Sequence, residues 1–138
     1  MAATPEGQTS SARRIVVPPL LLLALRLAMA AVFVGGGVMK LAGAGVMVRL
    51  FADVGAGQWL RYLVGIMELA GGSLLMVPAW TGLAALGLIV MMIGAAMAEL
   101  FIIRRPPVAA AACALALMII AIGTFDDRGS APRRRGSG

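Results

Sequence analysis

Four long apolar segments alternate with short polar or proline-containing breaks along the chain. They cover residues 15–42, 59–77, 80–103 and 108–124. At a rise of about 1.5 Å per residue, these lengths lie near or above the roughly 20 residues that carry a helix across a bilayer. Pro18 and Pro19 fall in the first turn of the first segment, where a missing N–H costs least. The pattern predicts an all-α fold, a four-transmembrane-helix bundle over residues 15–124 with both chain ends on the same side.

The first connection is the longest, and its middle is amphipathic. Residues 46–52 place Arg49 among apolar side chains, which predicts a short helix lying at the membrane surface. Trp59, Tyr62 and Trp80 stand at the ends of the second and third segments, where an aromatic belt is expected. The chain ends are polar, and they are predicted to be a disordered N-terminal tail and a disordered basic C-terminal tail (1–14 and 125–138).

A secretory signal peptide is an alternative interpretation of the first segment. Arg13 and Arg14 would form its basic region, residues 20–25 its apolar core and residues 28–30 its cleavage site. Arg26 interrupts this arrangement just before that site. Hydrophobicity also continues to Val38, so a spanning helix is favoured.

The composition supports a membrane protein. Apolar residues make up 61% of the 138-residue chain and charged residues 13%, against about 45–50% and about 25% in soluble domains. The net charge of +6 includes arginines that flank the apolar middle at both ends. Such flanks suit an anionic cytoplasmic leaflet better than a nucleic acid, so both termini are expected in the cytoplasm. The alanine- and glycine-rich, lysine-poor composition suggests a bacterial inner (plasma) membrane.

The residues that are missing restrict the chemistry. The chain has no histidine, and Cys113 is its single cysteine. Bis-histidine haem, histidine-based zinc sites, Ser–His or Cys–His nucleophile pairs and an internal disulfide are therefore excluded. The ten methionines are ordinary packing residues, and no metal site and no covalently bound cofactor are predicted. The chain is not expected to be a complete redox enzyme alone.

Charged side chains within the predicted spans are the candidate functional residues: Arg26, Lys40, Glu68 and Glu99, with Arg61 near one end. A charge in the bilayer centre costs at least about 2.5–3.5 kcal/mol, so each should be paired or face water. Matching depths predict the ion pairs Arg26–Glu68 near mid-membrane and Lys40–Glu99 nearer the outside. Two interpretations remain open. The pairs could only fix which helices are neighbours, or they could line a polar pocket for a quinone, a lipid or an ion.

Small residues are expected at the helix contacts, because lipid gives membrane helices no hydrophobic reason to associate. The candidates are Gly35, Gly65, Gly72 and Gly94. Such positions would also permit a homo-oligomer.

Several segments together resemble DoxX-like membrane proteins. The first helix of that family is similar to residues 25–28 (LRLA) and 33–41 (FVGGGVMKL), and its next loop to 51–55 (FADVG). Its second helix is similar to residues 65–72 (GIMELAGG). The resemblance implies a four-helix membrane bundle in which Arg26, Lys40 and Glu68 match the family's polar positions. Glu99 stands where relatives often carry a histidine-like residue, which puts any imidazole-dependent role in doubt.

The resemblance also implies the first of three functional hypotheses. Some relatives are subunits of thiosulfate:quinone oxidoreductases or of membrane oxidoreductase complexes, so this chain is expected to be such a subunit or accessory protein. A quinone near the charged pocket and a membrane or soluble redox partner would then be required. The second hypothesis is a non-catalytic assembly factor or scaffold. The third is a small proton-coupled transporter, which ranks last because the first helix carries two cations and no acid.

Overall fold

The computed structural model describes residues 18–129, with side chains as far as Asp126, and this part is entirely helical without a strand. Each α-helix begins within four residues of a start expected from the apolar pattern. The elements are α1 (Pro19–Leu41), α2 (Gly45–Val54), α3 (Gln58–Leu74), α4 (Thr81–Met97), the π-helix η1 (Ala98–Ile103) and α5 (Val108–Gly129). The expected tail 1–14, with Arg13 and Arg14, and residues 130–138 of the expected tail 125–138 lie outside the described residues.

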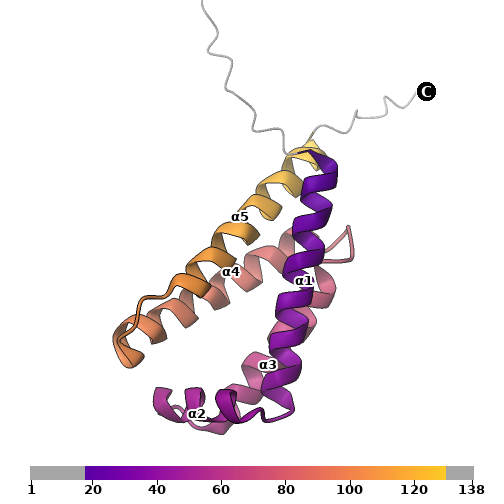
Figure 1. Ribbon diagram of the computed structural model, residues 1–138. Helices are drawn as coiled ribbons and strands as arrows, with labels where there is room; N and C mark the ends of the chain where they lie inside the picture. The colour runs from indigo at the N-terminus through magenta and orange to yellow at the C-terminus, as the bar shows by residue number, and fades with distance from the viewer. Residues whose placement is uncertain (1–17, 130–138) are drawn as a thin grey trace, which may run out of the picture.

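Two element boundaries differ from the expectation. The helix α3 ends at Leu74 and is followed by a turn, so it is shorter than the expected segment 59–77. The helix α5 continues to Gly129, so residues 125–129 are helical and not part of a disordered tail. The amphipathic stretch 46–52 lies within α2, which crosses the lower end of the molecule below α1 and α3 (Figure 1).

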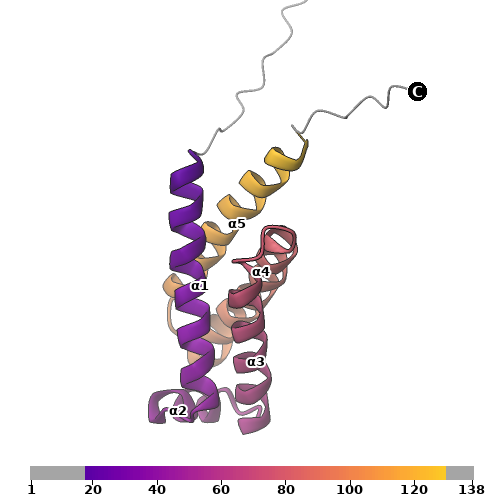
Figure 2. The ribbon, with the colours of Figure 1, turned by 90° about the vertical axis from the view of Figure 1, so that its right-hand side faces the viewer.

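The helices associate as two antiparallel pairs, α1 with α3 and α4 with α5 (Figures 1 and 2). Contacts between the pairs are fewer and run from α1 to α5 and from α3 to α4, whereas α1 makes no backbone approach to α4 in the described part. The start of α1 and the end of α5 lie at the same end of the molecule. The structure is thus two tightly packed helix pairs with smaller contacts between them, and not the regular four-helix bundle that the sequence predicts.

Three helical stretches are long and apolar enough to cross a membrane: Pro19–Leu41, Thr81–Ile103 and Val108–Asp126. The second of these joins α4 and η1 into one continuous element. The helix α3 has 17 residues and carries Arg61 and Glu68. Its length of about 25 Å is at the lower limit for a bilayer.

The buried core lies mainly between α4 and α5 and extends to side chains of α1 and the end of α3. Leu75, Leu117 and Ile120 are completely buried there, and Phe33 and Leu88 are nearly so. Many large apolar side chains are nevertheless exposed on the outside of every helix, among them Leu20, Leu83, Val90, Phe101 and Leu115. A soluble protein rarely exposes so much contiguous apolar surface, but lipid acyl chains can cover it.

Candidate functional site

Glycines hold α1 and α3 close together along one face of each helix. A Cβ atom added to Gly37 would lie 2.8 Å from the Gly65 carbonyl oxygen, and one added to Gly72 would lie 3.0 Å from the Phe33 Cβ atom. Contacts this short leave no room for a side chain. The backbones can therefore approach closely, as small residues allow in membrane helices.

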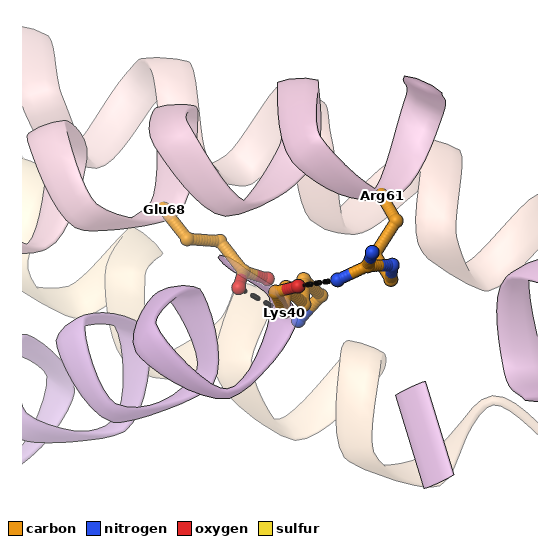
Figure 3. A network of polar contacts seen from close by, with 3 residues as sticks. All are labelled: Lys40, Arg61 and Glu68. Atoms are coloured by element: carbon orange, nitrogen blue, oxygen red, sulfur yellow. Dashed lines mark hydrogen bonds and ion pairs between the residues drawn. The ribbon is translucent and has the colours of Figure 1, made fainter. Parts of the chain in front are cut away.

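An ion pair joins the two helices next to this contact (Figure 3). The Lys40 ammonium donates to Glu68 Oε2 at 2.7 Å, and the exposed side-chain fractions are 12% and 7%. A Cβ atom on Gly36 would lie 3.2 Å from Glu68 Oε2 and 3.7 Å from Lys40 Nζ. The missing side chain at Gly36 thus leaves the space into which Lys40 folds back along its own helix.

Arg61 lies on α3 beside the end of α1 and is only 4% exposed. One of its terminal nitrogens, Nη1, donates to the Lys40 carbonyl oxygen (Figure 3). Its Nε donates to Gln58 Oε1 at 2.8 Å, and its guanidinium lies 4.2 Å from the centre of the Tyr62 ring. Because α1 ends at this point, Arg61 supplies a donor to a carbonyl at the negative end of that helix.

Arg26 meets the turn between α3 and α4. Its Nε and Nη2 donate to the Leu75 carbonyl oxygen at 3.1 and 2.9 Å, and the Thr81 hydroxyl donates to the same oxygen at 3.1 Å. Leu75 caps the end of α3, where carbonyl groups lack helical partners. Arg26 therefore satisfies the end of a helix, and it has no carboxylate partner among the described side chains.

Glu99 lies in the π-helix that continues α4. Its Oε1 accepts from Arg105 Nη2 at 2.6 Å, while Oε2 is buried and has no hydrogen-bond partner in the described part. The backbone N–H of Arg105 also donates to the Glu99 carbonyl at 3.0 Å, and Arg104 between them has a positive φ of 57°. This local turn ties Glu99 to the loop that follows it.

Both predicted ion pairs are wrong. Glu68 pairs with Lys40 instead of Arg26, and Glu99 pairs with Arg105 instead of Lys40. The first error arose from depth, because the prediction put Glu68 level with Arg26, whereas the structure puts Leu75 level with Arg26. The second arose from neighbourhood, because α1 does not pack against α4 or η1 in the described region.

Of the four glycines expected at helix contacts, two lie in such a contact and two do not. Gly65 and Gly72 lie in the contact between α1 and α3, but an added Cβ atom on Gly35 or Gly94 would meet nothing within 4 Å. The sequence analysis missed Gly36 and Gly37 as partners in this contact. The run of three glycines at 35–37 was a signal that could have identified them.

A largely apolar cleft of about 250 Å³ lies between α3 and α4. Sequence reasoning did not predict it. Met67, the neighbour of Glu68 in the chain, lines it, so α3 presents its charged face to α1 and an adjacent apolar face to the cleft. The other lining residues are Ala70, Gly71, Leu74, Trp80, Leu83, Ala84, Gly87, Leu88 and Met91.

These features define a small helical membrane protein whose intramembrane charges are bound mainly by groups of the same chain. A sequence model described as the DoxX-like family matches residues 24–124, most of the chain. The chain belongs to the DoxX-like family, which confirms the resemblance seen in the sequence. No curated protein and no solved structure matches it.

Proposed function

We propose that this chain is a subunit of, or an accessory to, a membrane oxidoreductase complex, and that its Lys40–Glu68 site accommodates a quinone or a lipid. Residues that could carry electrons are scarce in this chain, with no histidine and one cysteine. The redox centre would therefore belong to a membrane or soluble partner. The role of this chain is to hold that partner and the quinone in the membrane.

The state of the Glu68 carboxylate is the observation that carries the proposal. Oε2 accepts from Lys40, but Oε1 accepts no hydrogen bond from any described residue. This oxygen is not completely buried, so it is free to accept a hydrogen bond from a ligand hydroxyl. The apolar cleft on the adjacent face of α3, which Met67 lines, suits the tail of the same ligand or of a lipid.

Purification of the complex from its native membrane tests this proposal. We expect a redox protein and a quinone to co-purify, and Glu68→Gln to lower the quinone content and the quinone-dependent activity. Asp53→Asn is the control, because it neutralises an exposed carboxylate on α2 outside the site. The double variant Lys40→Met/Glu68→Met removes the site without leaving one buried charge unpaired. A native complex without quinone or a redox partner would contradict the proposal.

A scaffold function is the second candidate, because the described intramembrane cations all bind acceptors within the chain. In that case Glu68→Gln should lower the abundance of the complex while the turnover per assembled complex stays unchanged. Proton-driven dye efflux from proteoliposomes would instead support the transporter hypothesis.

A further inference from the structure

Arg61 is a buried cation without an acidic partner. A guanidinium remains charged at any physiological pH, yet no carboxylate among the described side chains forms an ion pair with it. Its two hydrogen bonds go to neutral acceptors, the Lys40 carbonyl and the Gln58 amide oxygen. Glu68 lies about two turns further along α3 and is already paired with Lys40.

The nearby helix ends do not balance this charge. The carbonyl end of α1 contributes about half a negative charge, and the amide end of a helix contributes about half a positive charge. The α2 helix begins at Gly45, only a few residues after α1 ends, so the two helix ends roughly cancel at this corner. About one positive charge is left over. A buried charge of this kind is costly unless an anion is present.

Free donors are available at the same corner. The α2 helix has no side-chain cap and no acidic residue in its first turn. Among residues 18–126, the backbone N–H groups of Gly45 and Val46 and the Arg61 Nη2 group have no hydrogen-bond acceptor. A Cβ atom on Gly43 would lie 3.7 Å from Arg61 Nη1 and 4.0 Å from Nη2, so the guanidinium packs against the backbone two residues before Gly45. Helix amides and a guanidinium together are the donors that a phosphate group prefers.

The depth of this corner identifies the source of the phosphate. Trp59 and Tyr62 are on the same turn of α3 as Arg61 and are 64% and 47% exposed. Aromatic side chains of this kind lie at the level of the lipid headgroups. We propose that Arg61 and the first turn of α2 bind the phosphate of an anionic phospholipid. This inference does not depend on a redox function.

Binding of a short-chain phosphatidylglycerol to the full chain in neutral detergent tests the site. Arg61→Gln should raise the dissociation constant about tenfold or more, and Arg61→Lys, which keeps the charge but loses the fork of donors, should give a smaller increase. Arg49→Gln is the matched control, because Arg49 is an exposed arginine on α2. It should change the dissociation constant by no more than about twofold. Equal losses from both arginine-to-glutamine variants would overturn the proposal.

A second pair of variants does not depend on the folding of Arg61→Gln. An added Cβ atom on Gly45 would meet nothing within 4 Å, so Gly45→Asp places an internal anion at the free helix end. It should weaken phosphatidylglycerol binding and raise the Tm in phosphatidylcholine nanodiscs. Ala52→Asp adds the same charge near the other end of α2 and should do neither. Unchanged lipid binding in Gly45→Asp would overturn the proposal, as would inorganic phosphate binding as tightly as the lipid.

Discussion

Lys40 behaves differently from most lysines near the end of a membrane helix. Such side chains usually extend toward the interface and keep the ammonium in water. Here the side chain turns back into the apolar layer, because Gly36 leaves space for it and Glu68 supplies the opposite charge. The sequence identified both residues as intramembrane charges. It could not identify their pairing, because a long flexible side chain makes the depth of its Cα atom a poor guide to the depth of its charge.

This pair should show strong energetic coupling. Lys40→Met or Glu68→Met alone leaves one buried charge without its partner, which should lower the free energy of unfolding by about 3–5 kcal/mol. The double variant should lose less than either single variant, because no unpaired charge remains. Reversible unfolding in mixed micelles measures all three, with Arg49→Met as an exposed control. Additive losses would mean that the two side chains do not stabilise each other.

At the scale of the elements, apolar segments and prolines predicted where most helices begin. Pro19 starts α1, Trp59 and Trp80 lie within one residue of the starts of α3 and α4, and α5 starts after Pro107. The register between helices was not predictable in the same way. Lipid-facing and partner-facing sides of these helices are both apolar, so hydrophobicity does not indicate which side packs. Glycine contacts decide the register of α1 and α3, and only coordinates show which glycines take part.

The two neighbouring glycines 35 and 37 allow a matched test of this packing. Gly37→Ala should lower the free energy of unfolding by about 1–3 kcal/mol, because its methyl group would lie 2.8 Å from a backbone oxygen of α3. Gly35→Ala adds the same methyl group where nothing lies within 4 Å, and it should be neutral or slightly stabilising because alanine favours helix. Unfolding of both variants in the same micelles gives the comparison. Equal effects would show that α1 and α3 do not pack through Gly37.

For the whole molecule, the direction of α3 follows from the contacts at both of its ends. Gly65 of α3 lies against Lys40 and Leu41 at the end of α1. Leu75, which caps the end of α3, lies against Arg26, nearer the start of α1. The end of η1 then returns to the level of α2, which it contacts. The α3 helix must therefore run from the α2 end toward the other end of the molecule, although it is shorter than the three apolar helices. The expected four crossings are consistent with this path.

Accessibility of single cysteines from the two sides of the membrane tests the path of α3. In a Cys113→Ala background, Asp53→Cys before α3 and Pro106→Cys before α5 should react with an impermeant maleimide from the same face. Ser137→Cys should react from the opposite face, which the basic chain ends predict to be cytoplasmic. If α3 did not cross, one crossing would be lost between the first two positions. Asp53→Cys and Pro106→Cys would then react from opposite faces, and Ser137→Cys would share the face of Asp53→Cys.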